Sequence, residues 1–205
     1  MSRRPPRRTA LRLSGLRMAG LTAAALLGAA GCSSAGSAPP GSFVAGDGVV
    51  TVIAPQQRQD PVTMAGTTLA GERLDLASLR GRTVVLNVWG SWCPPCRQEA
   101  TTLESAYQRL SGRGVAFVGV DTRDDTAQAK AYQDRYGITY PSLVDTGGLM
   151  LALRGAVAPS SIPSTLVIDT QGRVAARVSG PITSTDTLVG LVDTVISGGT
   201  GTASP

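Results

Sequence analysis

Two cysteines, Cys93 and Cys96, are the side chains of this sequence whose type and spacing best suit a chemical reaction. They stand in the segment Trp92-Cys93-Pro94-Pro95-Cys96. At this spacing the two residues can form a disulfide. When reduced, one thiolate can attack a disulfide of another molecule, and the second thiol can resolve the mixed disulfide. The sequence therefore predicts thiol–disulfide exchange at this pair.

A zinc site and a purely structural disulfide are the two alternatives for the pair. Zinc takes four ligands, whereas the chain of 205 residues has no histidine and only one further cysteine, Cys32. A structural disulfide over so short a loop would restrict the unfolded chain little. The lack of histidine also excludes Ser-His and Cys-His catalytic pairs. We therefore expect the pair to be redox-active and to need no metal or other cofactor.

The predicted elements on either side of the pair would position it. Thr83 to Trp89 is a nearly continuous apolar run, which is typical of a strand buried on both faces. A helix is predicted from about Pro94 to Leu110, because proline suits a first turn and apolar residues recur every three or four positions. A thiolate at a helix N-terminus is stabilised by free N–H groups and the helix dipole. We therefore expect Cys93 to be the exposed nucleophile and Cys96 the more buried resolving cysteine.

The rest of the chain alternates predicted strands and helices. Strands are predicted over 49–53, 115–120, 142–144, 165–169 and 174–179, a hairpin joins 67–69 to 73–76, and helices are predicted over 124–136, 148–153 and 185–196. This order implies parallel crossovers followed by an antiparallel hairpin. It predicts an α/β fold with a central mixed sheet flanked by helices.

The residues around the cysteines resemble the TlpA/ResA/CcmG (DsbE) branch of thioredoxin-like proteins. The resemblance rests on Val84 to Glu99 (VVLNVWGSWCPPCRQE), on Gly71 to Gly81 upstream and on Ile162 to Asp169 downstream. These motifs agree in order and spacing, and the resemblance covers roughly residues 60–197. It implies a thioredoxin-like fold with an N-terminal β-hairpin extension and a central helical insertion within residues 119–141.

The resemblance also implies roles for single residues. Pro163 would follow a cis peptide bond beside the disulfide. Glu99 would carry the proton of Cys96, while Asn87 stands where ordinary thioredoxins bury an aspartate. The alternative for Glu99 is a solvated carboxylate in the first turn of the helix. Trp92 is expected to cover the disulfide and to help dock partners. The residues implied to contact the substrate are Trp92, Pro94, Pro95, Ile162 and Pro163.

The N-terminal segment has the pattern of an export signal. Residues 1–31 carry six arginines and no acid, and an uncharged run of 14 residues, Met18 to Gly31, is too short for a comfortable membrane span. Ala29-Ala30-Gly31-Cys32 resembles a bacterial lipobox, so Cys32 is expected to be lipidated and to anchor the protein at the outer face of the cell membrane. The alternative is a cysteine inside a removed signal or an uncleaved anchor.

Composition then divides the remaining chain. A Ser/Gly/Ala/Pro-rich stretch predicts a flexible tether over 32–46, followed by one domain over 47–197 and a disordered tail over 198–205. Outside the leader there are 13 basic and 14 acidic residues, so the high overall pI belongs to the leader. We therefore expect no nucleic-acid partner.

Three features of the motif favour a reducing protein. Pro94 and Pro95 have no N–H that could stabilise the Cys93 thiolate, the motif contains no histidine cation, and Glu99 would add negative charge. Each raises the thiol pKa of Cys93 and lowers the stability of the reduced form, hence the reduction potential. Arg97 acts in the opposite direction but is expected to point to solvent.

The resemblance implies partners for such a reductant. A membrane thiol carrier of the CcdA/DsbD type would supply electrons. The acceptor would be the haem-binding cysteine pair of apocytochrome c, as in cytochrome c biogenesis, or another secreted disulfide. Three rivals stay open: a DsbE-type oxidant, a peroxiredoxin-like peroxidase and a copper-binding module. The peroxidase motif Pro-x-x-x-Thr-x-x-Cys is not met, because Gly90 stands three residues before Cys93, and the copper module lacks nearby histidine and methionine.

Overall fold

The computed structural model describes residues 42–45, 48–158 and 160–198. Over these residues the chain forms nine strands, three α-helices and four short 3-10 helices. In chain order they are β1 (Ser42–Ala45), β2 (Gly48–Val52), η1 (Pro55–Gln57), β3 (Ala65–Thr67), β4 (Arg73–Asp75), η2 (Leu76–Leu79), β5 (Val84–Trp89), α1 (Pro94–Leu110), η3 (Ser111–Arg113), β6 (Ala116–Thr122), α2 (Thr126–Tyr136), β7 (Ser142–Asp145), η4 (Leu149–Leu153), β8 (Ser164–Ile168), β9 (Val174–Ser179) and α3 (Thr185–Ile196).

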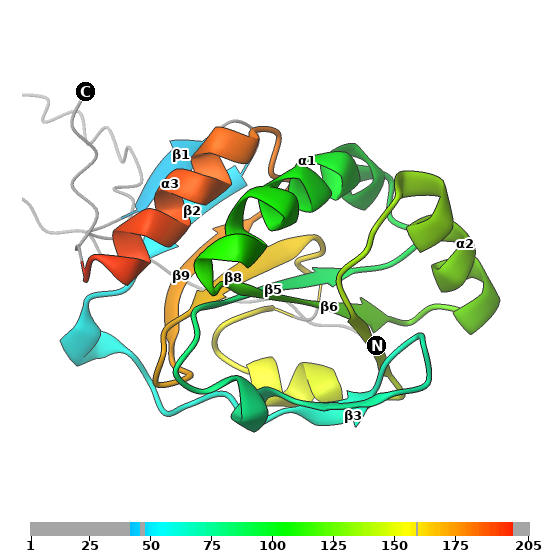
Figure 1. The fold of residues 1–205 in the computed structure, drawn as a ribbon, viewed down its shortest axis with the longest axis horizontal. Coiled ribbons are helices and arrows are strands. Elements are labelled where there is room, and N and C mark those ends of the chain that lie inside the picture. The colour runs from blue at the N-terminus through cyan, green and yellow to red at the C-terminus, as the bar shows by residue number, and fades with distance from the viewer. Residues whose placement is uncertain (1–41, 46–47, 159, 199–205) are drawn as a thin grey trace, which may run out of the picture. The chain divides into compact units, whose positions relative to one another are not determined.

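Seven of the strands form one mixed sheet in the order β1-β2-β9-β8-β5-β6-β7 (Figure 1). β5 pairs parallel with β6, and β6 pairs parallel with β7, so these three strands end at one edge. β8 pairs antiparallel with β5 and therefore begins at the same edge. This pairing brings the residues after β5, the residues after β6 and the residues before β8 together.

Each face of the sheet carries an apolar core. Alternate side chains of β5 point to opposite faces: Val85 packs with α1 and α3, whereas Leu86 and Val88 pack with η2 and η4. Figure 1 shows α1 and α3 on one face of the sheet, with η4 (yellow) and β3 on the other. Because both faces are covered, the strand reads as the continuous apolar run seen in the sequence.

The predicted mixed α/β fold is confirmed, and most elements lie within two residues of their predicted bounds. β3 lies two residues earlier than predicted, since it ends at Thr67 although 67–69 was predicted. The cause is that Leu69 N–H donates to the carbonyl of Ser142 and so leaves the hairpin for β7. The predicted helix 148–153 is the 3-10 helix η4.

The central insertion contains α2 and leads into β7. The helix begins at Thr126, two residues later than predicted, because the Asp125 carboxylate caps it by accepting from the N–H groups of Ala127 and Gln128. It ends at Gly137, whose φ of 64° gives the left-handed conformation of a helix C-cap. Both ends of α2 are therefore set by local capping.

Most of the N-terminal predictions concern residues outside the described ranges. These are the signal segment 1–31, the lipidated Cys32 and most of the tether 32–46, and they stay predictions. The strand β1 falls inside the range assigned to the tether, where it pairs antiparallel with β2, Ser42 opposite Thr51. β2 in turn pairs with β9, so the sheet extends through both strands. Among the described residues, no helix is long and apolar enough to cross a membrane.

Candidate active site

The two cysteines form a disulfide at the start of α1. The S–S distance is 2.16 Å and the Cα–Cα distance is 5.3 Å. Cys93 is the N-cap of the helix, and the backbone N–H of Cys96 points at Cys93 Sγ, with a donor–acceptor distance of 3.2 Å. Pro94 and Pro95 occupy the two positions between and bring no N–H. The N–H of Cys96 is therefore the one first-turn N–H that reaches the Cys93 sulfur.

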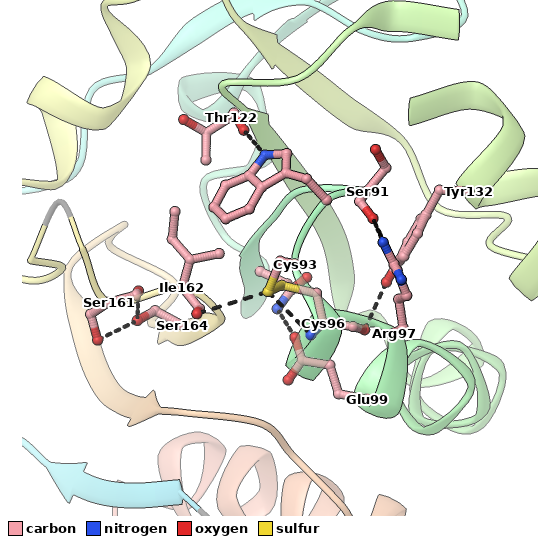
Figure 2. The surroundings of a disulfide bond; sticks show 12 residues. Ser91, Cys93, Cys96, Arg97, Glu99, Thr122, Tyr132, Ser161, Ile162 and Ser164 are labelled. Carbon is pink, nitrogen blue, oxygen red and sulfur yellow. Dashed lines mark hydrogen bonds between the residues drawn. A yellow bond between two sulfur atoms is a disulfide. The ribbon is translucent and has the colours of Figure 1, made fainter. Parts of the chain in front are cut away.

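The strand pairing explains what stands on one side of the disulfide. Val88, next to the end of β5, pairs with Ser164 at the start of β8. The residue before β8 is Pro163, and the Ile162–Pro163 peptide bond is cis, as the resemblance implies. Cys93 Sγ lies 3.9 Å from the carbonyl oxygen of Ile162 (Figure 2). A backbone carbonyl is therefore presented to any chain that reacts with Cys93.

The expectation that Cys93 is exposed is wrong for this oxidised form. Cys93 is 2% exposed and Cys96 is fully buried. Both sulfurs belong to an apolar cluster that includes Trp89 and Tyr132, with Ile162 packed against it. The difference in burial between the two cysteines has the predicted direction but is small.

Glu99 is not the solvated carboxylate of the alternative interpretation, because its side chain is fully buried. Burial raises its pKa from 4.5 to about 8, although two hydrogen bonds act in the opposite direction. Oε2 accepts from the N–H of Ile182 at 3.0 Å, and Oε1 accepts from the amide of Asn87 at 2.8 Å. A carboxyl group with this pKa can hold or accept a proton near neutral pH.

Asn87 is suited to lie beside a buried acid. Its amide nitrogen donates to Glu99 and also to Thr165 Oγ1 at 3.1 Å, and the residue is 3% exposed. An aspartate at this position would set two carboxyl groups against each other in a buried site, which raises the cost of ionising either. An asparagine at 87 therefore suits a buried glutamate at 99, because it donates a hydrogen bond to the carboxylate where an aspartate would repel it.

Trp92 is attached to the neighbouring strand rather than lying free over the disulfide. Its indole N–H donates to the carbonyl of Thr122 at the end of β6, 3.2 Å away, and the guanidinium of Arg123 lies 4.9 Å from the ring centroid. Trp92 stays 43% exposed. Gly90 makes this position possible, because a Cβ there would lie 2.5 Å from the indole nitrogen.

Arg97 is exposed, as expected, but its guanidinium is also bound to the loop before the cysteines. Its Nε and Nη2 donate to the carbonyl of Ser91, at 3.1 and 2.8 Å. Ser91 is held from the other side by Asp124, whose carboxylate accepts from its N–H and, at 2.8 Å, from its hydroxyl. The loop before the cysteines is therefore fixed by a cation on α1 and an acid before α2.

Two residues near the site, Tyr132 and Asp121, could not be found from the sequence. The hydroxyl of Tyr132 on α2 donates to the carbonyl of Cys96 at 2.7 Å, and its ring stacks on Trp89 with 4.4 Å between centroids. Asp121 at the end of β6 is 2% exposed, and burial together with the nearby Asp124 raises its pKa to about 8. The contacts of Tyr132 depend on the docking of α2, and the pKa of Asp121 depends first on its burial, and local sequence patterns determine neither.

The described residues offer no group of three or more His, Cys, Asp or Glu side chains that could hold a metal ion. What the site can do is thiol–disulfide exchange. It combines a dithiol at a helix start, a carbonyl from the cis-proline segment and a buried carboxyl group that titrates near neutral pH.

The Tyr132→Phe variant is expected to lower the free energy of unfolding of the oxidised protein by about 1 kcal/mol, the net value of one buried hydrogen bond. The ring stack is kept, so the loss reports the bond to the Cys96 carbonyl. Guanidinium denaturation followed by tryptophan fluorescence measures it. Tyr136→Phe, in the same aromatic stack, is the matched control, and an equal loss there would contradict the assignment.

Known proteins with similar sequences include thiol–disulfide oxidoreductases. A profile of the AhpC/TSA family matches residues 57–177. Two proteins called thiol-disulfide oxidoreductase ResA are 31% identical over 114 residues (Bacillus anthracis) and 32% identical over 113 residues (Bacillus subtilis strain 168). These matches cover 56% and 55% of this chain and 64% and 62% of the relatives, so the chain spans less than two thirds of their length.

Solved structures are similar over more of their length. A secreted thiol-disulfide isomerase from Corynebacterium glutamicum is 32% identical, with a TM-score of 0.64, covering 74% of this chain and 96% of that one. A DsbF homologue from Corynebacterium diphtheriae is 29% identical, with a TM-score of 0.63, covering 71% of this chain and 92% of that one.

Proposed function

This chain belongs to the AhpC/TSA family of thioredoxin-fold proteins, and on that premise we propose that it is a thiol–disulfide oxidoreductase that reduces protein disulfides outside the cytoplasm. The observation that carries the proposal is the Cys93–Cys96 disulfide at the start of α1, beside the cis Ile162–Pro163 bond and the buried Glu99. The names of the relatives, ResA and a secreted thiol-disulfide isomerase, support it.

The reaction needs only the two cysteines and one proton carrier. The Cys93 thiolate attacks a substrate disulfide, forming a mixed disulfide and releasing one substrate thiolate, which takes up a proton. The thiol of Cys96 then gives its proton to the Glu99 carboxylate and attacks Cys93 Sγ. The second substrate thiolate leaves and is protonated, and the Cys93–Cys96 disulfide remains. Two electrons have passed to the substrate, and an external dithiol must return them.

The backbone around Cys93 supports the reducing direction. Because Pro94 and Pro95 carry no N–H and no histidine stands nearby, the thiolate receives one helix N–H, that of Cys96. Glu99 contributes less than the sequence suggested, since a pKa of about 8 leaves it mostly neutral at pH 7 in the oxidised protein. The direction therefore depends on the two prolines.

The finer assignments follow from the sequence. We propose that Cys32 anchors the protein at the outer face of the membrane, that a membrane thiol carrier of the CcdA/DsbD type reduces it, and that oxidised apocytochrome c is a substrate. These rest on the lipobox-like segment and the resemblance. The nearest rival is a DsbE-type oxidant. A secreted Mycobacterium tuberculosis disulfide oxidoreductase, described as homologous to E. coli DsbE, is also similar, at 29% identity and a TM-score of 0.55.

The reduction potential of the Cys93–Cys96 couple tests the direction. We expect a value of about −200 mV or lower, in the range of glutaredoxins and thioredoxin. Equilibration with glutathione buffers, followed by tryptophan fluorescence, measures it. Pro95→His is the calibrating variant, because an added cation stabilises the thiolate and raises the potential. A wild-type value near the roughly −120 mV of a strong oxidant would support the oxidant instead.

A further inference from the structure

A groove lies beside the disulfide, between the Ser91–Trp92 loop and α2, and we call it the α2 groove. Its walls include Arg97 on one side and Gln128, Tyr132 and Arg135 of α2 on the other. Its volume is about 600 Å³, within the roughly 300–1,000 Å³ that small-ligand sites occupy. Neither cysteine lines the groove, but Trp92, which does, directly precedes Cys93 in the chain, so the groove begins one residue from the nucleophile.

The charges around the α2 groove are mainly positive. Arg97 and Arg135 line it. Arg123 does not line it, but its guanidinium lies 4.9 Å from the ring centroid of Trp92, which does. All three arginines are exposed. The acid that lines it is Asp124, whose oxygens already accept from the N–H and hydroxyl of Ser91. The guanidinium groups therefore have N–H donors that the one carboxylate lining the groove does not occupy.

Arg97 and Arg135 differ in how free they are to bind. Arg97 already donates from Nε and Nη2 to the carbonyl of Ser91. Arg135 lies 5.8 Å from the ring centroid of Tyr136, a contact that leaves its N–H groups able to donate. Arginine also suits carboxylates particularly well, because its planar fork donates two parallel hydrogen bonds.

Among the residues drawn around the disulfide in Figure 2, those on the other side are uncharged. Figure 2 shows Ile162, Ser161 and Ser164 on one side of Cys93, and Ser91, Arg97 and Tyr132 on the other. A substrate chain that reaches Cys93 past the Ile162 carbonyl therefore continues toward the α2 groove. Its residues on that side would meet the arginines.

We propose that the α2 groove binds acidic side chains of the disulfide-bearing polypeptide and so selects substrates with aspartate or glutamate close to the reacting cysteine. This inference rests on the proposed function and names a substrate class for it. The guanidinium groups attract the acidic segment during the encounter and hold it while Cys93 attacks.

Three matched peptides test the proposal. Each has one internal disulfide, and the three residues beside it are glutamate, serine or lysine. The second-order rate constant for reduction of each by the reduced full-length protein is measured by stopped-flow fluorescence at low and high salt. We expect the glutamate peptide to react about tenfold faster than the lysine peptide at low salt, the lower end of electrostatic steering effects. The ratio should fall at 1 M salt because the charges are screened.

The double variant Arg123→Gln/Arg135→Gln should bring the glutamate-to-lysine ratio close to one. Arg97 is left in place because it holds the Ser91 loop. Arg73→Gln/Arg154→Gln is the matched control, since it removes two exposed arginines from β4 and from the end of η4. The control should keep the wild-type ratio.

Each other outcome overturns the inference in a recognisable way. Equal rates for the three peptides, or a ratio unchanged in the double variant, contradict the α2 groove assignment alone. If the double variant loses binding to vesicles of phosphatidylglycerol and phosphatidylcholine while the peptide ratio is unchanged, the arginines serve a lipid surface instead. No reduction of any peptide would contradict the proposed function as well.

Discussion

In the native host, the Cys96→Ser variant is expected to accumulate as disulfide-linked complexes with its substrates. Cys93 can still attack, but the thiol that breaks the mixed disulfide is gone. Turnover should fall on the order of 10³-fold or more, as when a residue of a covalent mechanism is lost. The adducts are separated on non-reducing gels and identified by mass spectrometry after reduction.

The control for this experiment is the Cys93→Ser variant. It should be equally inactive but should form no adduct. Cys96 is fully buried, so a substrate disulfide cannot reach its sulfur directly. Adducts that form equally through Cys96 would contradict the assignment of the nucleophile. Apocytochromes among the trapped proteins would support the proposed substrate, whereas a broad set of secreted proteins would favour general oxidation.

The Glu99→Gln variant should slow the resolving step by about 10²-fold at neutral pH, the lower end of general acid–base contributions. Glutamine cannot take the proton of Cys96. It keeps the volume and can keep the contacts, because Oε1 can accept from the N–H of Ile182 while a flipped Asn87 amide accepts from the new N–H. The rate of product release from a preformed mixed disulfide measures the step.

The pH profile separates proton transfer from a structural effect. In the wild type the rate of resolution should rise toward pH 8, because the pKa of Glu99 is about 8 and the carboxylate is the form that accepts the proton. The deficit of the variant should be largest below this pH and narrow above about pH 9, where the thiol ionises by itself. A deficit that is the same at every pH would mean that Glu99 only positions the helix. Glu72→Gln, at an exposed position, is the matched control.

The same group links stability to pH. The folded oxidised protein keeps a proton on Glu99 up to about pH 8, whereas the unfolded chain loses it near 4.5. Since the folded state binds more protons in this window, the free energy of unfolding falls as pH rises through it. Glu99→Gln should remove this part of the slope. Asp121, whose pKa is raised from 3.8 to about 8, keeps its own part.

The residues that carry the chemistry could be recognised from the sequence. Cys93 and Cys96 are near neighbours in the chain, and the strand before them and the helix after them follow from local apolar patterns and from proline at the first helical turn. The bounds of α1 and α3 agree with the prediction because side-chain periodicity and capping act within a few residues. The cis bond before Pro163 agrees with what the resemblance of the Ile162–Asp169 segment implies.

Protonation and docking depend on the tertiary structure. Glu99 looks like a first-turn carboxylate in the sequence, and it is buried because Asn87 from β5 and Ile182 before α3 close over it. Desolvation sets its pKa, and desolvation is a property of all the groups packed around it rather than of its neighbours in the chain.

For the cysteine pair, too, some properties follow from the sequence and others only from the tertiary structure. Its spacing and its place at a helix start determined which reaction the protein can perform. Only the tertiary structure decided that Cys93 is nearly buried, that the Tyr132 hydroxyl donates to the Cys96 carbonyl and that the Trp92 indole N–H donates to the Thr122 carbonyl. The two hydrogen bonds join residues 36 and 30 positions apart, and local patterns carry no information about which distant side chains will meet.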